Sequence, residues 1–493
     1  METSDQENSP SVQPADRKPP AKINLLTMFR LGLFQMGLGI MSLLTLGVLN
    51  RIMIDELTVL PFIAAGAIAM YQFVSPARVW FGQLSDAKTI FGYHRTGFVW
   101  IGAALFTTLS FVALQVVWQL GISLQATGWG IVTYSWAGLL ALVFALYGLA
   151  LSASSTPFAA MLVDVSDEDN RSQLIGIVWS MLMVGIVIGA IIASKLLETP
   201  EICGADILSY SPTQTAKVAN IASLQATINP VFLIMPATVF SLCLIGTVGV
   251  EKKYSRFSSR STLVEREDQI TLGRALKVLT ANRQTGIFFT FLLVLTISLF
   301  MQDTVLEPYG GEVFGMCISE TTRLNAFFGM GTLISLSLTS FLILPRLGKK
   351  KTTRYGCIAA SVCFGLIILA GFSRNTGLLQ ASLFFLGLAS GVLTAGGTSL
   401  MLDLTAAETA GTFIGAWGLA QAMARGLATL LGGVVLNLGK LLFTAPVFAY
   451  GLVFALQAVG MILAIWFLRR VNISEFRANA KQSLTAVMES DLD

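Results

Sequence analysis

Long apolar runs recur along the whole chain and constrain its fold more than any other feature. A helix needs roughly 20 apolar residues to cross a hydrocarbon layer about 30 Å thick. Only 12% of the 493 residues are charged, whereas an ordinary soluble protein carries roughly 25%, so a bilayer is the solvent that suits these runs. We therefore predict an all-α polytopic membrane protein with about twelve transmembrane helices. The expected spans are 29–50, 57–81, 97–117, 135–162, 173–196, 231–250, 286–307, 322–344, 354–372, 378–402, 412–436 and 446–467.

Polar stretches between the runs divide the chain into two halves joined by a linker. Lys and Arg gather in this linker and in the loop 345–354. Because such residues favour the cytoplasmic side of a membrane, we predict that the linker and both termini are cytoplasmic. The basic residues need no nucleic-acid partner to explain them. The expected segments are a disordered tail at 1–28, a six-helix half at 29–250, a basic linker at 251–285, a second six-helix half at 286–468 and a tail at 469–493.

An internal repeat relates the two halves. When residues 148–176 are aligned with residues 387–415, Asp164 falls on Asp403 and the flanking glycines coincide. Because a polar Asp and its glycine spacing recur together, chance similarity between apolar segments is a poor explanation. A repeat in the same orientation predicts two parallel six-helix units, the arrangement of the major facilitator halves.

The loop after the second expected span resembles the major-facilitator signature loop. Gly82 is followed by Asp86, Lys88 and Arg95, with a wider spacing between the acid and the bases than the usual pattern. We expect Gly82 to permit a tight turn against a neighbouring helix and Asp86 to lie near a helix N-terminus or an Arg. His94, the only histidine of the chain, is expected to form surface hydrogen bonds rather than to ligate a pigment or metal.

Asp164 and Arg171 follow the facilitator pattern of an acid and then an Arg before the fifth span. Our hypothesis is a charge latch that breaks when the halves rock, with Asp403 as its counterpart in the second half. The latch requires Asp164 to lie near Lys88 or Arg95, and Asp403 near the basic loop of its own half. The alternative is a solvated loop pair worth about 0–1 kcal/mol.

Charged residues inside spans are costly and are therefore candidates for function. Arg425 lies near the middle of the eleventh span, while Asp303 and Glu307 lie toward the outer end of the seventh. A depth estimate from the helical rise makes Asp303 the first expected partner of Arg425. Tyr71 or Gln72 is the alternative if the eleventh helix turns toward the interface between the halves.

Charged residues also close the first span at its outer end. Arg51, Asp55 and Glu56 form this group, next to Asn50. We interpret the three charged residues as interfacial anchors, and we keep Glu56 and Asn50 among the candidates for the cleft.

The sequence contains no arrangement typical of a catalytic or metal centre. One His and five Cys without a CxxC pair give no metal cluster, and no Walker A motif predicts nucleotide binding. A Ser/His/Asp triad is not expected either. We expect most cysteines to be small core residues, with a Cys203–Cys317 disulfide as the less favoured alternative.

Several longer runs are similar to the PucC-type, or bacteriochlorophyll-delivery, branch of the major facilitators. They are residues 49–57, the two segments 77–83 and 91–97, and residues 302–315. The resemblance extends over nearly all of residues 24–470. It implies a protein that is not an enzyme and that assists the assembly of light-harvesting or photosynthetic complexes in a thylakoid or intracytoplasmic membrane. The run 249–254 looks more like the versions from oxygenic phototrophs.

The resemblance also implies ligands and partners. Chlorophyll or bacteriochlorophyll would be a transient ligand, and the partners would be small light-harvesting or photosystem membrane proteins and pigment-synthesis enzymes. Because no His lies inside a span, the pigment magnesium would take Asn, Gln, a carboxylate, a water or no ligand. Two alternatives stay open. One is a proton-coupled transporter of a small solute, using Asp303, Glu307, Asp55 or Glu56, and the other is a scaffold that transports nothing.

Overall fold

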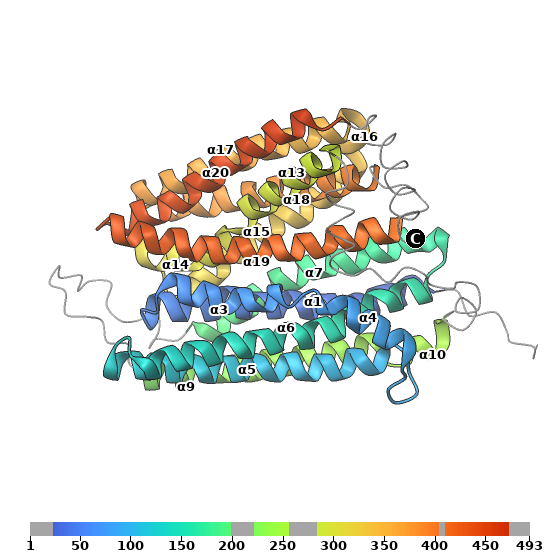
Figure 1. Ribbon diagram of the computed structural model, residues 1–493, viewed down its shortest axis with the longest axis horizontal. Coiled ribbons are helices and arrows are strands. Elements are labelled where there is room, and N and C mark those ends of the chain that lie inside the picture. Colours follow the sequence, from blue (N-terminus) through green and yellow to red (C-terminus); the bar gives the residue numbers. More distant parts are fainter. Residues whose placement is uncertain (1–22, 199–220, 256–282, 404–409, 473–493) are drawn as a thin grey trace, which may run out of the picture.

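A computed structural model describes residues 23–198, 221–255, 283–403 and 410–472 of the chain. Figure 1 shows long helices running side by side in two bundles, one for each half of the sequence. Eleven of the described helices are long and apolar enough to cross a membrane. The remaining segment, which begins at Ile318, is less apolar because it carries Glu320, Arg323 and Asn325. The prediction of an all-α membrane protein with about twelve spans is confirmed.

The first half contains six spans, several of them interrupted. The first span is longer than the sequence predicted and includes two π-helical segments, a feature that is frequent at functional sites. The second span breaks at Val74–Pro76, where proline disfavours a continuous helix. The elements are α1 (Leu25–Ser42), η1 (Leu43–Val48), α2 (Leu49–Arg51), η2 (Ile52–Glu56), α3 (Pro61–Phe73), α4 (Ala77–Ala87), α5 (Thr96–Thr127), α6 (Ile131–Val165), α7 (Glu168–Leu197), α9 (Ile221–Thr247) and α10 (Val250–Tyr254).

The second half repeats this organisation. Its first span is interrupted at Met301 and then continues to Phe314, beyond the predicted end at residue 307. The elements are α13 (Arg283–Phe300), α14 (Gln302–Phe314), α15 (Ile318–Leu338), η3 (Thr339–Ile343), α16 (Leu344–Leu347), α17 (Lys349–Ser373), α18 (Thr376–Asp403), α19 (Ala410–Leu442) and α20 (Pro446–Arg470).

The helix contacts follow the same pattern in both halves. In the first half α1 packs on α7 and α9, and α6 packs on α3 and α5. In the second half α13 packs on α19 and α20, and α18 packs on α15 and α17, which are the corresponding pairs. Two further contacts, α3 with α19 and α7 with α15, join the halves. The predicted parallel six-helix repeat is therefore present in the packing.

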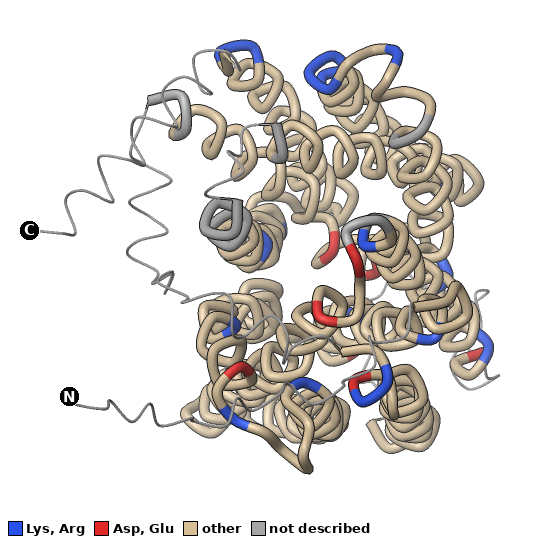
Figure 2. Tube along the Cα trace, turned by 90° about the vertical axis from the view of Figure 1, so that its right-hand side faces the viewer, with Lys and Arg blue, Asp and Glu red and all other residues tan. Residues whose placement is uncertain are grey.

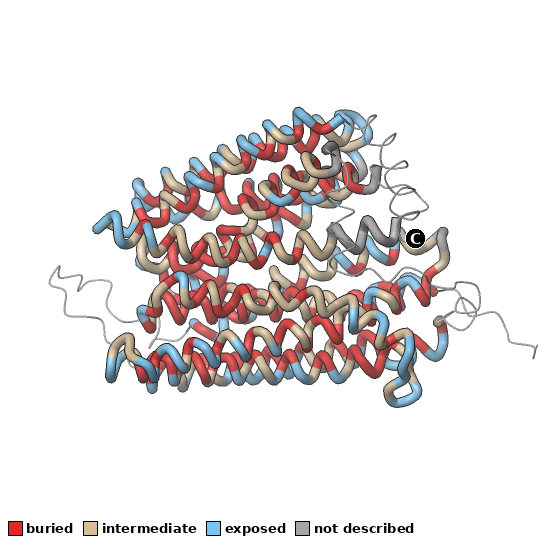
Figure 3. The backbone as a smooth tube through the Cα atoms, viewed as in Figure 1, coloured by how far each residue is buried: buried red, intermediate tan, exposed pale blue. Residues whose placement is uncertain are grey.

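Buried apolar side chains form two clusters that correspond to the halves. One consists mainly of residues between 23 and 254, and the other of residues between 288 and 471. In Figure 3 buried positions follow the lines where helices meet, while exposed positions lie on the outer surfaces. Apolar side chains on those outer faces include Leu142, Val362 and Ile462, as expected for helices that face lipid rather than water.

The two ends of the bundle differ, and they are called here the basic end and the far end. The basic end carries the α4–α5 turn, α10 and the α16–α17 turn; the far end carries the α5–α6 turn, the turn after α14 and the α19–α20 turn (Figure 1). Arg30 in α1 donates to the carbonyls of Ile245 and Val248 at the end of α9. The first described helix therefore begins at the end of the bundle where the sixth span finishes.

Candidate functional site

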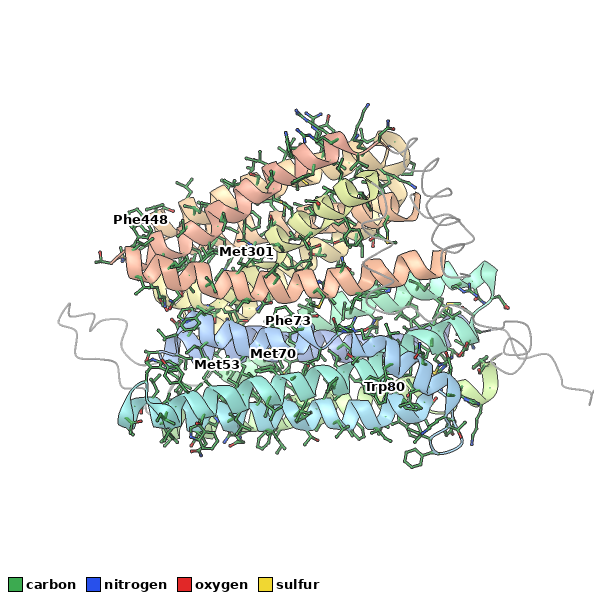
Figure 4. The ribbon with its side chains drawn as sticks, viewed as in Figure 1. Met53, Met70, Phe73, Trp80, Met301 and Phe448 are labelled. Atoms are coloured by element: carbon green, nitrogen blue, oxygen red, sulfur yellow. The ribbon has the colours of Figure 1, made fainter. Side chains whose placement is uncertain are left out.

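The two halves meet closely where α3 crosses α19. A Cβ added to Gly426 would lie 3.0 Å from the Cβ of Gln72 and 3.1 Å from the ring of Phe73. Gln72 Nε2 donates to the hydroxyl of Tyr71 at 2.7 Å. Figure 4 shows Phe73 on the side of its half that faces the other half. The crossing brings the polar part of α3 next to Arg425.

Arg425 is exposed to solvent although it lies in the middle of α19 and faces other helices. Its guanidinium carbon lies 4.1 Å from the centroid of the Phe300 ring, at the end of α13. It interacts electrostatically with Tyr71 and Asp303. An exposed side chain in the middle of a helix, with Phe300 and the α3 crossing beside it, indicates open space between these helices, which we call the cleft.

The expected contact between Arg425 and Asp303 is not formed. No ion pair within 4.0 Å joins these two described residues, and the guanidinium lies over Phe300 instead. The depth estimate assumed an unbroken helix, whereas the helix is interrupted at Met301. The alternative neighbours Tyr71 and Gln72 are the ones found beside α19, through the crossing at Gly426.

Arg78 is a second cation at this cleft, and the sequence analysis did not identify it. It lies two residues after the helix break at Pro76, and its Nε atom is buried without a hydrogen-bond partner. It interacts electrostatically with both Tyr71 and Arg425. An Arg two residues after a Pro at the end of an apolar span was the signal that could have found it.

Polar residues at the far end join the two halves. The buried Asn50 donates to the carbonyl of Thr304 at 2.5 Å. Arg51, which is only 3% exposed, is ion-paired with Asp55 and donates to the carbonyl of Met316 at 3.2 Å. The interpretation of Arg51 as an interfacial anchor is therefore wrong, because α14 covers it.

Three further contacts surround this far-end junction. A Cβ added to Gly311 of α14 would overlap both Arg51 and Asp55, so the ends of these two side chains would have to shift to admit a larger residue there. Glu56 lies 3.5 Å from the Arg51 guanidinium. In the second half, the carboxylate of the buried Glu307 in α14 accepts a hydrogen bond of 2.5 Å from Asn325 of α15.

At the basic end, Arg95 is the centre of a buried network within the first half. Its Nε lies 3.0 Å from the Asp164 carboxylate, and its Nη1 donates to Ser85 at 2.6 Å. It is also ion-paired with Asp86, and it is only 2% exposed. The pairing of Asp164 with Lys88 or Arg95 that the latch hypothesis requires is present, through Arg95. Lys88 itself is exposed.

Glu251 adds a contact that the sequence analysis missed. Its carboxylate accepts hydrogen bonds from the backbone N–H groups of His94 and Thr96, both at 2.7 Å, and from the Thr96 hydroxyl at 2.6 Å. These groups form the N-terminus of α5, where the helix dipole favours a negative charge. Lys252 lies 4.7 Å from the centroid of the Tyr93 ring. The end of the sixth span is thus attached to the start of the third.

One other prediction for the basic end needs correction. Gly82 is not at a turn but inside α4, where a Cβ would be in ordinary contact with Thr156 at 3.5 Å. The turn is made later, at Phe91 and Gly92, which both have positive φ. Arg171 donates to Ser166 at 3.3 Å in the described structure.

The second half uses different groups at the corresponding place. Lys350, at the start of α17, donates to the carbonyls of Arg469 at 3.3 Å and Val471 at 2.7 Å. Asp403 is the last residue of α18, as Asp164 is in the last turn of α6, but its side chain is outside the described part of the chain. Its predicted contact with Arg346 or 349–351 stays a prediction.

The family model of the PUCC protein matches residues 48–476. The chain belongs to the PucC family. Among its relatives, Protein PucC of Rhodobacter capsulatus is 27% identical over 471 residues, covering 93% of this chain and 95% of the relative. The bacteriochlorophyll synthase 44.5 kDa chain, also of Rhodobacter capsulatus, is 30% identical over 451 residues, covering 89% and 94%. The predicted family is confirmed.

Solved structures similar to this PucC-family chain are transporters. The nucleoside transporter NupG has a TM-score of 0.59 at 15% identity, covering 91% of this chain and 99% of its own. A bacterial homologue of the human lysosomal transporter Spinster, in an inward-facing state, has a TM-score of 0.59 at 12% identity, covering 93% and 96%. These similarities show the major facilitator fold, and the protein is a multi-pass membrane protein.

The charges of this PucC-family chain are distributed unevenly. Figure 2, in which the basic end faces the viewer, shows Asp and Glu segments near the middle of the ring of helices and many Lys and Arg segments toward its edge.

In the described ranges, no group of three or more His, Cys, Asp or Glu could hold a metal ion. Cys243, Cys357 and Cys363 are free and buried, as expected. Cys317 is disulfide-bonded, against the favoured expectation, and Cys203 lies outside the described residues.

Proposed function

We propose that this protein assists the assembly of light-harvesting or photosynthetic complexes by handling chlorophyll or bacteriochlorophyll. The observation that carries the proposal is the family match over residues 48–476, together with relatives named Protein PucC and bacteriochlorophyll synthase 44.5 kDa chain. Its partners are then small pigment-binding membrane proteins and pigment-synthesis enzymes, and its location is a photosynthetic membrane. The protein itself catalyses no reaction in this proposal.

The cleft between the halves supports pigment handling. It is bordered by the rings of Tyr71, Phe73 and Phe300, and aromatic rings offer a broad apolar surface to a flat ring system. The only histidine, His94, lies in the α4–α5 turn and not in a span. The pigment magnesium would therefore find only weaker side-chain ligands in the cleft, and weak ligation suits a transient ligand that must be passed on.

Absorption spectroscopy of the purified protein tests the proposal. The protein, purified in mild detergent from a phototrophic host, is expected to carry chlorophyll or bacteriochlorophyll in a stoichiometric amount. Replacing Phe300 by Ala should reduce this pigment, whereas Phe372→Ala on the exposed surface of α17 should not. A colourless protein from a host that is making pigment would contradict the proposal.

A proton-coupled transporter of a small solute is the second candidate, and Glu307 favours it. This residue is 2% exposed, and one of its carboxylate oxygens has no hydrogen-bond partner in the structure. A buried carboxyl group of this kind can carry a proton. Proton uptake that accompanies solute entry into liposomes, and that is lost in Glu307→Gln, would support this function over pigment handling.

A further inference from the structure

Two guanidinium groups at the cleft have no carboxylate of a described residue in contact with them. The ion pairs formed by the described residues involve Arg51, Arg95 and Lys440, and neither Arg78 nor Arg425 belongs to them. The Nε of Arg78 is buried and lacks any hydrogen-bond partner. An unsatisfied donor of a charged group inside a protein is costly, so a ligand that supplies the missing acceptor would be stabilising.

The electrostatic environment of the pair is positive. Arg78 and Arg425 interact with each other and with Tyr71, and Asp303 is the carboxylate that interacts with Arg425. Among the described residues, two cations and one acid leave at least one uncompensated positive charge, whatever the protonation of Asp303. Such a site repels metal cations and gives no advantage to a neutral solute, but it attracts an anion.

The surroundings of the pair are aromatic. Phe300 lies under Arg425, and Phe73 borders the crossing of α3 and α19. A ligand here would meet charge at one point and apolar rings beside it.

We propose that Arg78 and Arg425 bind the anionic group of an amphipathic molecule whose apolar body lies against these aromatic residues. The two cations come from different halves, α4 and α19, so one anion would bridge the halves. The inference rests on the proposed pigment handling for its first ligand, a chlorophyll-type ring with a free carboxylate. An isoprenoid chain with a phosphate presents the same chemistry. A fully esterified pigment has no such anion and binds less tightly.

A matched pair of pigments tests the charge requirement. Chlorophyllide a and its methyl ester differ only in the carboxylate, and their binding to the protein in lipid nanodiscs can be followed by quenching of tryptophan fluorescence. The acid is expected to bind at least about tenfold more tightly than the ester, as expected for loss of a charge-assisted hydrogen bond. Equal affinity of the acid and the ester would overturn the proposal.

Substitutions then assign the effect to the two residues. Arg78→Gln and Arg425→Gln should each weaken acid binding about tenfold and leave ester binding unchanged, which also shows that the variants are folded. Arg425→Lys should keep part of the preference, and Arg346→Gln, on the exposed surface of the basic end, should keep all of it. An acid preference that survives both Gln variants would contradict the assignment.

A second probe separates the two possible sources of the anion. It also separates the proposed anion site from the proposed pigment handling. Geranylgeranyl phosphate is offered in the same assay. If it binds in an arginine-dependent way while neither pigment binds, the anion site is supported and pigment handling is contradicted. If acid and ester bind equally and independently of both arginines, pigment handling is supported and the anion site fails.

Discussion

The far end and the basic end of the protein are held together in different ways. At the far end, Asn50 and Arg51 of the first span bond to Thr304 and Met316 of the second half, and Ser194 meets Ser319 at 3.2 Å. At the basic end, the described polar contacts of Arg95 lie within the first half. Those of Lys350 lie within the second. Among the described residues, these polar contacts of the far end join the halves, whereas those of the basic end lie within one half.

This difference indicates which parts can move. A rocking motion of two rigid halves requires strong contacts inside each half and contacts between them that can exchange. The Arg95 network and the Glu251 cap are contacts inside one half, and the Asn50 and Arg51 contacts lie between the halves.

Removal of Arg95 should have the largest effect. In Arg95→Ala the carboxylates of Asp86 and Asp164 lose a buried cation, and loss of one partner of a buried pair costs about 3–5 kcal/mol. We expect a much lower unfolding temperature and little protein in the membrane. Lys88→Ala, in the same turn but exposed, is the control and should behave as wild type. Equal stability of the two variants would show that the network is not a structural centre.

Removal of the Glu251 carboxylate should be intermediate. Glu251→Ala leaves the backbone N–H groups at the start of α5 without their acceptor, at a cost of about 1–2 kcal/mol. Glu251→Gln keeps one acceptor oxygen and should recover part of the loss. The unfolding temperature of the three proteins, measured in the same detergent, checks this order. A Gln variant less stable than the Ala variant would contradict the cap.

Removal of Asn50 should change stability least among these variants but should affect the junction of the halves. Asn50→Ala loses a hydrogen bond worth about 1 kcal/mol. A Ser194→Cys substitution, buried between the halves, should then react faster with a maleimide than it does with Asn50 present. Ser382→Cys, buried within the second half, should show no change. Unchanged labelling of the first site would mean that Asn50 does not hold the far end.

The orientation of the ends in the membrane can be tested by labelling single cysteines. Lys88 and Asn375 are both exposed, the first at the basic end and the second at the far end. Each is replaced by Cys in a separate variant. The basic residues predict that an impermeant reagent added outside intact cells labels only the Asn375→Cys variant. Labelling of the Lys88→Cys variant under the same conditions would reverse the predicted topology.

Sequence reasoning succeeded where a property is carried by single segments. The spans were visible because a bilayer requires a long apolar helix whatever its neighbours are. The repeat was visible because Asp164 and Asp403 keep their positions in both halves. The partner of Asp164 could be narrowed to two bases, Lys88 and Arg95, because the signature loop and Asp164 lie at the same end of the bundle. For that reason the fold could be predicted. The contact between Asp164 and Arg95, one of the two contacts of the candidate latch, could be predicted too.

The sequence by itself determined the membrane solvent, the number of spans within one and the family, since each depends on local hydropathy or on motifs read in order. Only the tertiary structure decided that Arg51 is buried by α14 and that Glu251 caps α5. It also decided that Arg425 lies over Phe300 and near Arg78. Such contacts depend on helix breaks at Pro76 and Met301 and on rotation of each helix about its axis. A periodic apolar pattern leaves that rotation open, because lipid and protein interior accept the same side chains.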